Sequence, residues 1–249
     1  MSGSDSNTRR NKPPNKRRRG SNHAEVRSWM HQALFDLPHE CSILSLGSEQ
    51  AYLAPYLAEY SANVAVLDTS AEQVAQMASR HRGVAFMQHL AGAPLPFRHE
   101  RFDAVWCCDY LDRVFEPTSA LREIHRVLVP AGRLIVTVPD HGRLRAVLIA
   151  LFNWDGHFAL SNPRIRYFTR TSLAKLVREV GFGEISTGRG GAVRRIAGRL
   201  VPRTLLLRAR KDPTVWQNSD DAVMGYPDVG LRFGDDLAYA GRLAQRLKS

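Results

Sequence analysis

The chain of 249 residues has only three cysteines, and its apolar runs are short. Cys41, Cys107 and Cys108 are too few for a disulfide framework, and the adjacent pair lacks the CxxC spacing typical of metal sites. The longest apolar run, 144–154, is interrupted by an arginine and is far shorter than the roughly 20 residues that a membrane helix needs. The basic N-terminus is not followed by the apolar segment of a secretory signal. We therefore expect a cytoplasmic protein with reduced cysteines.

Acidic residues are also few compared with basic ones. The chain has 35 lysines and arginines against 24 aspartates and glutamates, a formal net charge of +11. Residues 1–22 hold seven basic side chains and one acid, and almost no large apolar side chain, so we expect a disordered basic arm there. Such an arm favours weak, nonspecific contact with nucleic acid or an anionic membrane, although a solvated tail has the same composition. The segment 189–203 adds a second positive patch.

Hydrophobic periodicity predicts strands that alternate with helices. Short apolar runs indicate strands, and apolar residues at three- and four-residue steps indicate helices. This alternation is typical of βαβ units, which build an α/β fold with a doubly wound parallel sheet and helices on both faces. The expected strands are 42–46, 63–67, 84–87, 102–108, 133–138, 184–187 and 204–210, and the expected helices are 24–37, 51–60, one opened by Thr69 or Ser70, 117–127 and 170–180.

The first two expected strands end in residues that suit a nucleotide-like ligand. The first strand is followed by Gly47 and the second by Asp68, about 21 residues later. About 21 residues are enough for one strand, a tight turn, a helix and a second strand that lies beside the first. The carboxylate at the end of the second strand then faces the turn after the first strand. There it is able to accept two hydrogen bonds from the vicinal hydroxyls of a ribose. From position alone, capping of the following helix is an equally good interpretation of Asp68.

An ordered series of short motifs runs over roughly residues 40–187. The motifs are ILSLG at 43–47, VLDTS at 66–70, LPF at 95–97, FDAV at 102–105, LREIHRVLVPAG at 121–132, LIVTVP at 134–139, RIRYFT at 164–169 and VGF at 180–182. Together they resemble the class I S-adenosylmethionine-dependent methyltransferases, and most closely the small-molecule branch of methyltransferase type 11/12. The series is far more specific than any one motif. The resemblance implies a seven-stranded, mostly parallel sheet of the Rossmann-like methyltransferase fold, with one antiparallel strand.

The resemblance also implies S-adenosylmethionine as methyl donor and a set of donor-binding residues. In that family pattern, Asp68 would bind the ribose, Gly47 would open the loop under the methionine part, and Leu95 would help to close the adenine side. The residues assigned to the donor are Gly47, Ser48, Glu49, Asp68, Thr69, Leu95 and Cys108.

The donor loop departs from the family pattern. Family members usually carry an acid and three glycines there, whereas this chain has Ser45 for the acid and keeps only the first glycine. Glu49 and Ala51 should narrow or reshape the loop, because a Cβ limits close approach. The acid that commonly receives the adenine amino group falls at about Ala91. Two lost charged hydrogen bonds, at about 1.5–3 kcal/mol each, would weaken donor binding by two or more orders of magnitude.

Methyl transfer needs a general base only where the acceptor is not already nucleophilic. The candidates near the carboxyl edge are Asp109, Asp112, Asp140 and His141. We expect catalytic roles for His141, just after the fifth strand, and Asp109; a solvated turn histidine is the competing interpretation. None of the nine histidines forms an HxxxH or His–Cys pattern, so no metal site is expected.

We expect a methyltransferase-like domain over 23–211, in which 139–169 is an insertion that covers the acceptor. The apolar run at 144–152 has helical spacing, and it suits a hydrophobic acceptor pocket, a membrane contact or the core. The extension 212–249 should end in a helix that docks to the domain or to a second subunit, as in a homodimer. Methyl transfer to a small-molecule acceptor is the favoured function. The alternatives are a catalytically inactive binding or scaffold protein, which assists an active partner subunit, and an RNA-directed methyltransferase.

Overall fold

The computed structural model describes most of the chain between residues 28 and 214. The described residues are 28–29, 31–47, 54–81, 83–152, 154–159, 162, 164–190, 194–196, 199–201 and 204–214. The expected basic arm (1–22), most of the expected C-terminal extension (215–249) and the donor-loop residues Ser48 and Glu49 lie outside them.

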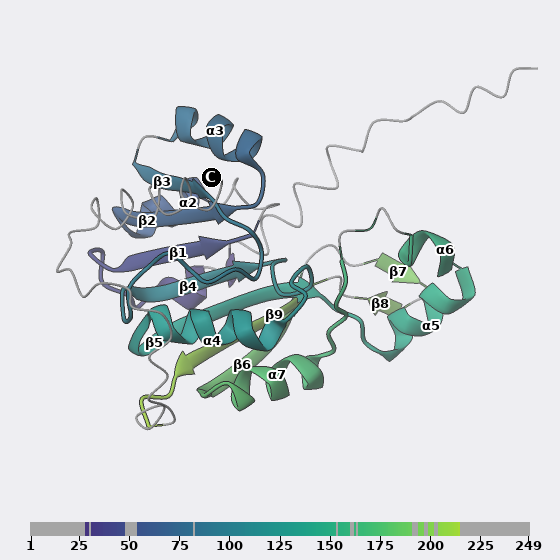
Figure 1. Cartoon of the computed structure of the whole chain (residues 1–249). Helices are drawn as coiled ribbons and strands as arrows, with labels where there is room; N and C mark the ends of the chain where they lie inside the picture. Colours follow the sequence, from purple (N-terminus) through teal and green to yellow (C-terminus); the bar gives the residue numbers. More distant parts are fainter. Residues whose placement is uncertain are drawn as a thin grey trace, which may run out of the picture.

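A seven-stranded sheet forms the centre of the molecule, in the order β3-β2-β1-β4-β5-β9-β6 (Figure 1). The pairs from β3 to β5 are parallel, and β9 is antiparallel to both of its neighbours. The expected mostly parallel sheet with one antiparallel strand is therefore confirmed. The strands of this sheet are β1 (Ser42–Leu46), β2 (Asn63–Asp68), β3 (Val84–Gln88), β4 (Phe102–Cys108), β5 (Leu128–Pro139), β6 (Phe182–Gly190) and β9 (Thr204–Lys211).

Helices cover the sheet on both faces, because alternate side chains of its central strands are apolar and buried. Leu44 and Leu46 of β1 belong to one core cluster with residues of α4 and α7, whereas Ile43 belongs to a second cluster with α2. At the centre of the second cluster the fully buried Trp106 packs edge-on against Trp29, at 5.9 Å between ring centroids. The described helices are α2 (Ala54–Tyr60), α3 (Ala71–Arg80), α4 (Pro117–Val127), α5 (Arg143–Phe152), α6 (Trp154–His157) and α7 (Arg170–Glu179).

The winding of the sheet reverses between β1 and β4. From β1 the chain proceeds to β2 and β3 on one side, and β4 and β5 then extend the sheet on the other side. The loops that follow β1 and β4 therefore diverge, and a crevice opens at the carboxyl ends of these strands.

Three segments differ from the sequence prediction. β5 begins at Leu128, five residues before the predicted start. Leu128 pairs with Phe102 of β4, and a register shift after Phe102 and a positive φ of 59° at Ala131 connect this pair to the regular part of the strand. β6 is longer than expected, since its alternating burial and three glycines hide it from a search for apolar runs. Within 189–203, where a basic connector was expected, the hairpin β7 (Arg194–Ile196) and β8 (Arg199–Val201) forms.

The segment between β5 and α7 contains α5 and α6, which project from the end of the molecule that also bears β7 and β8 in Figure 1. None of the described helices combines the length and the apolar character needed to cross a membrane.

Candidate functional site

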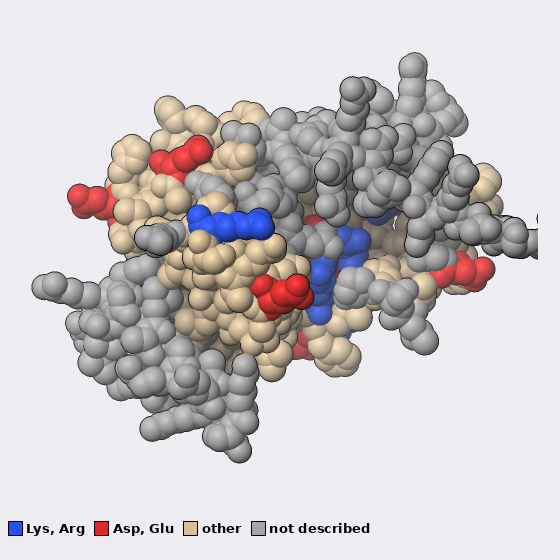
Figure 2. All heavy atoms as spheres, turned by 90° about the horizontal axis from the view of Figure 1, so that it is seen from above, with Lys and Arg blue, Asp and Glu red and all other residues tan. Residues whose placement is uncertain are grey.

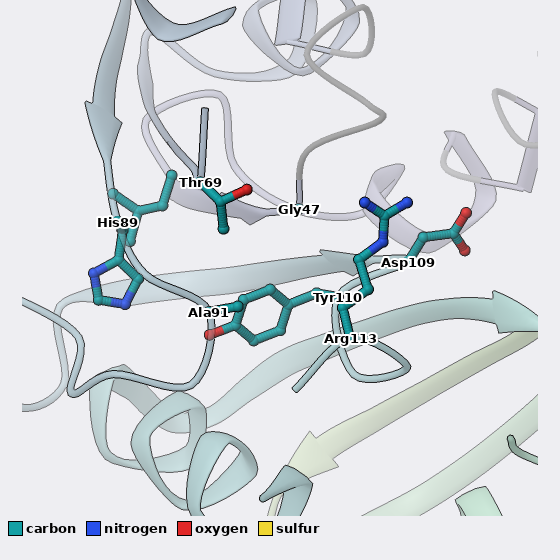
Figure 3. Close-up of a pocket in the computed structure, with 8 residues that line it drawn as sticks. Gly47, Thr69, His89, Ala91, Asp109, Tyr110 and Arg113 are labelled. Atoms are coloured by element: carbon teal, nitrogen blue, oxygen red, sulfur yellow. The ribbon is translucent and has the colours of Figure 1, made fainter. Parts of the chain in front are cut away.

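A cavity of about 250 Å³ lies at the carboxyl edge of the sheet, where the winding reverses (Figure 3). Its walls come from the residues at or just after the ends of β1, β2, β3 and β4. Tyr110 and Arg113 reach it from the loop after β4, and Thr69 and His89 follow β2 and β3. The lining residues are Gly47, Leu67, Thr69, His89, Ala91, Asp109, Tyr110 and Arg113.

Gly47 closes the cavity against β4 because it has no side chain. Its φ is +124°, and a Cβ built on it would lie 2.0 Å from the carbonyl oxygen of Cys108. The Gly47 amide also donates a hydrogen bond of 3.3 Å to the carbonyl of Leu67, which holds the turn against β2. Only glycine permits both the backbone torsion and this close approach.

Asp68 ends β2 with its carboxylate buried, at 3% exposure. Its Oδ1 accepts a 2.8 Å hydrogen bond from the Ser70 amide, whereas Oδ2 has no hydrogen-bond partner in the part of the chain that the structure describes. Burial raises the pKa of Asp68, against the Ser70 hydrogen bond and the positive charge of Arg113, which lower it. The N-cap of α3 is Ser70, whose hydroxyl accepts from the Gln73 amide. Asp68 thus supports the turn before the helix, and one of its oxygens stays available.

Asp68 itself is not one of the residues that line the cavity, but its neighbours Leu67 and Thr69 are. Of the residues predicted for the donor, Gly47 and Thr69 line the cavity directly, and Asp68 lies between two residues that do.

The other two described residues predicted for the donor lie off the cavity. The thiol of Cys108 is fully buried and hydrogen bonded to the Thr137 hydroxyl, and burial raises its pKa well above the ordinary value. Leu95 is buried, and its amide donates a 2.7 Å hydrogen bond to Oε2 of Glu123. Cys108 reaches the site with its backbone carbonyl, under Gly47, rather than with its side chain.

The loop after β4 supplies charge and shape. Asp109 has a positive φ of 43°, and its amide donates a 2.8 Å hydrogen bond to the carbonyl of Thr137. The Tyr110 hydroxyl accepts a 2.9 Å hydrogen bond from the Gly92 amide, and burial raises the pKa of Tyr110 to about 12. Tyr110 therefore stays protonated at neutral pH and shapes the cavity rather than acting as a base.

The wall formed after β3 carries no acid. Ala91, at the position where the sequence resemblance would place an adenine-binding acid, lines the cavity there. Beside it, His89 lies with Nε2 3.2 Å from the Ala93 carbonyl oxygen, and burial lowers its pKa, so the ring is neutral at pH 7. This side of the cavity is thus uncharged and offers an imidazole and backbone groups.

His141, the expected base, is buried just after β5 and is not one of the cavity-lining residues. Its Nδ1 lies 3.0 Å from the Pro139 carbonyl oxygen, and its Nε2 has no hydrogen-bond partner among the described residues. The rings of His157 and Tyr167 pack against it at 5.3 and 4.8 Å between centroids. Burial lowers the pKa of His141 to about 4, which makes it a weak base.

Arg164 links this segment to the cavity, a role that the sequence did not reveal. Its Nε lies 2.8 Å from Oδ2 of the buried Asp112, and its Nη2 lies 3.7 Å from Oδ2 of Asp109. The amides of Ile165 and Arg166 both donate to the Asp112 carbonyl, at 2.9 and 3.0 Å. Asp112, a candidate base in the sequence, is therefore held in an ion pair.

Asp140, the remaining candidate base, also has partners. Its Oδ1 accepts a 3.0 Å hydrogen bond from the Gly142 amide, and its Oδ2 lies 3.1 Å from Nε of Arg189. Arg164, Arg113, Tyr110 and His89 were not predicted as site residues. The motif at 164–169 was noted, but nothing in a single sequence says which acid an arginine contacts.

Comparisons with known proteins point to one family. Residues 44–136 match the family model described as a methyltransferase domain. Similar solved structures include a provisionally named methyltransferase from Bacillus halodurans, at 17% identity, which covers 76% of this chain and 99% of that chain with a TM-score of 0.61. A provisionally named methyltransferase in a complex with the Haloferax volcanii Trm112 methyltransferase activator has 18% identity, coverage of 79% and 94%, and a TM-score of 0.59.

A third structure is an S-adenosylmethionine-dependent methyltransferase from Thermotoga maritima, described as a possible histamine N-methyltransferase. It has 20% identity, covers 76% of this chain and 91% of that chain, and has a TM-score of 0.56. A search of the curated proteins found no match. At these identities the solved structures show the fold, and they confirm the sheet architecture that the sequence predicted.

Proposed function

We propose that this chain transfers a methyl group from S-adenosylmethionine to a small-molecule acceptor. Its residues 44–136 match a methyltransferase domain, which we assign to the class I S-adenosylmethionine-dependent superfamily. The observation that carries the proposal is the Oδ2 atom of Asp68. It is buried at the carboxyl end of β2 without a hydrogen-bond partner among the described residues. Buried polar atoms are almost always paired, and a ribose hydroxyl of the donor supplies the missing hydrogen.

The backbone around Gly47 fits the same ligand. Gly47 approaches the Cys108 carbonyl directly, so the turn after β1 packs closely against β4, and Gly47 lines the cavity beside it. A donor with its ribose at Asp68 extends from there past Thr69 toward Asp109. When bound, S-adenosylmethionine supplies an electrophilic methyl group, so the protein mainly has to align the acceptor and exclude water.

The side chains of the cavity are better suited to holding ligands than to removing protons. Tyr110 stays protonated, and the Asp109 carboxylate lies 3.7 Å from the Arg164 guanidinium. His141, which does not line the cavity, is a weak base, because burial lowers its pKa to about 4. We therefore extend the proposal to an acceptor whose attacking atom is already nucleophilic at neutral pH, such as an amine or an ionised phenol.

A catalytically inactive relative is the second candidate, and two observations favour it. Ala91 provides no carboxylate on the adenine side, and the cavity of about 250 Å³ is slightly smaller than typical ligand pockets, which start at about 300 Å³. Such a protein would keep the sheet as a binding or scaffold module.

Calorimetric titration of the full chain separates the two candidates. The methyltransferase proposal predicts saturable heat with S-adenosylmethionine and with its demethylated product S-adenosylhomocysteine. It also predicts a thermal shift with each ligand, because ligands that bind only the native state stabilise it. If millimolar ligand gives neither heat nor a thermal shift, the scaffold function replaces the proposal.

A further inference from the structure

The helix α5 is apolar in sequence but exposed in the structure. Its sequence is RLRAVLIALF, and none of its described side chains is buried. Val147 is 53% exposed, Leu151 67% and Phe152 79%. By contrast, α4, a helix of similar length, buries five of its residues in the core. Contiguous exposed apolar surface on a protein of this kind marks an interaction site.

Aromatic side chains continue this surface beyond α5. Trp154 and Phe158 are 59% and 48% exposed and lie 4.6 Å apart between ring centroids. Phe158 also packs against Tyr167, at 5.7 Å. Tryptophan and tyrosine rings, with an apolar body and one polar group, favour the boundary between lipid and water.

The same end of the chain is strongly basic. Residues 141–170 contain five arginines and one acid, and residues 189–203 contain five arginines and no acid; of these, Arg164 and Arg189 pair with the buried Asp112 and Asp140. Thr204 is the register partner of both Pro139 and Gly190, so the segments that carry α5 and the β7–β8 hairpin leave the sheet at one edge. Figure 1 draws the hairpin near the α5–α6 end; in Figure 2 the described basic side chains lie near the middle of the face rather than at that end.

We propose that α5 and α6, which follow the sheet edge where the segment with the β7–β8 hairpin also begins, form a surface that docks on an anionic lipid membrane. The exposed apolar and aromatic side chains of α5 and α6 enter the headgroup region, while basic residues such as Arg143, exposed at the start of α5, contact lipid phosphates. A helix of ten residues lies in this interface rather than crossing it. The docking surface and the cavity lie at the same carboxyl edge of the sheet. An acceptor in the membrane would therefore be close to the cavity. Docking itself does not depend on the proposed methyl transfer.

Flotation of the full chain with lipid vesicles tests this proposal. The probes are vesicles of phosphatidylcholine alone and of phosphatidylcholine with roughly one third phosphatidylglycerol. We expect binding to the anionic vesicles only, and weaker binding as salt increases. Phe152→Ser should weaken binding about tenfold, since one exposed apolar ring no longer enters the lipid. Arg143→Gln, at an exposed position of α5, should weaken it about fivefold, the value for one charge near the surface.

Phe35→Ser is the matched control. Phe35 is 74% exposed, close to the value for Phe152, but its neighbour Asp36 pairs with Arg133 at the opposite edge of the sheet. We expect Phe35→Ser to bind vesicles like the unchanged chain, and circular dichroism should report the same fold for all variants.

Four results would overturn the proposal. The first is no binding to either kind of vesicle, and the second is binding that Phe152→Ser leaves unchanged but removal of residues 1–22 abolishes. The third is a homodimer in solution that Phe152→Ser converts to a monomer, which would assign the face to a second copy. The fourth is binding to an RNA oligonucleotide without binding to vesicles. Because no donor is added, failure here leaves the proposed methyl transfer untouched, and failure of donor binding leaves the docking intact.

Discussion

The cavity and the α5–α6 region both come after the carboxyl ends of the strands, but their side chains differ in how far they are buried. At the cavity, Gly47 approaches the backbone of Cys108 directly, and Asp68 and Tyr110 are buried with defined partners. In α5, the side chains of Val147, Leu151 and Phe152 are exposed. In our proposals, the half with buried, hydrogen-bonded side chains holds the donor, and the half with exposed apolar side chains meets a membrane.

Among the described residues, several polar contacts between the two regions centre on Asp112. Arg164 pairs with Asp112 and approaches Asp109, and the amides of Ile165 and Arg166 donate to the Asp112 carbonyl. A change at these contacts should therefore affect both halves, whereas changes elsewhere should affect only one.

The largest effect on stability is expected from Gly47→Ala. The new Cβ would meet the Cys108 carbonyl oxygen, and alanine disfavours a φ of +124°. We expect a loss of about 4 kcal/mol in the free energy of unfolding, measured by urea denaturation. Gly83→Ala is the control, because nothing lies within 4 Å of its Cβ position, and it should change stability by less than about 0.5 kcal/mol. Equal losses in the two variants would mean that the turn at Gly47 is not rigid.

A smaller loss, about 3 kcal/mol at neutral pH, is expected from Arg164→Gln, because it leaves the buried Asp112 carboxylate without its cation. Burial already raises the pKa of Asp112, and removing Arg164 should raise it further. A raised carboxyl pKa penalises the folded state above that pKa, so the loss should shrink as the pH falls toward 4. Lys175→Gln, which breaks the exposed pair with Glu179, should cost less than about 0.5 kcal/mol. A loss for Arg164→Gln that does not vary with pH would contradict this account.

His141 should have a still smaller effect on the free energy of unfolding, and this effect should appear only as the pH falls. Its pKa is lowered by burial from 6.5 to about 4, so the folded state holds the ring neutral while the unfolded state takes up a proton. The stability that this group contributes is complete above pH 6.5, and about 2 kcal/mol of it is lost by about pH 5. Over that pH range, the melting temperature of His141→Gln should change less with pH than that of the unchanged chain. His39→Gln, at an exposed position, should keep the original slope.

The sequence predicted those parts of the fold whose patterns are local. The bounds of β1, β4 and α4 agree with the prediction, since continuous apolar runs and regular helical spacing mark them. The early part of β5 and the β7–β8 hairpin were missed because pairing with distant strands, rather than local composition, makes those residues extended.

The candidate site was predicted in part for the same reason. Strand ends locate Gly47, Asp68 and Asp109, since the topology brings carboxyl ends to one edge. The presence of Arg113 and His89 in the cavity wall depends on how two loops fold over it, and neither loop has a spacing rule. The donor-binding and catalytic roles of these residues stay predictions.

Donor titration of Asp68→Asn tests the central claim most directly. An asparagine at this position keeps the shape but replaces one carboxylate oxygen with a hydrogen-bond donor and removes the charge. We predict that S-adenosylmethionine binds the unchanged chain and the control Glu72→Gln, at an exposed position of α3, with equal affinity. Asp68→Asn should bind roughly 10- to 150-fold more weakly, the equivalent of one charged hydrogen bond. Equal affinity in all three proteins would contradict the account, because the buried oxygen of Asp68 would then have no part in holding the donor.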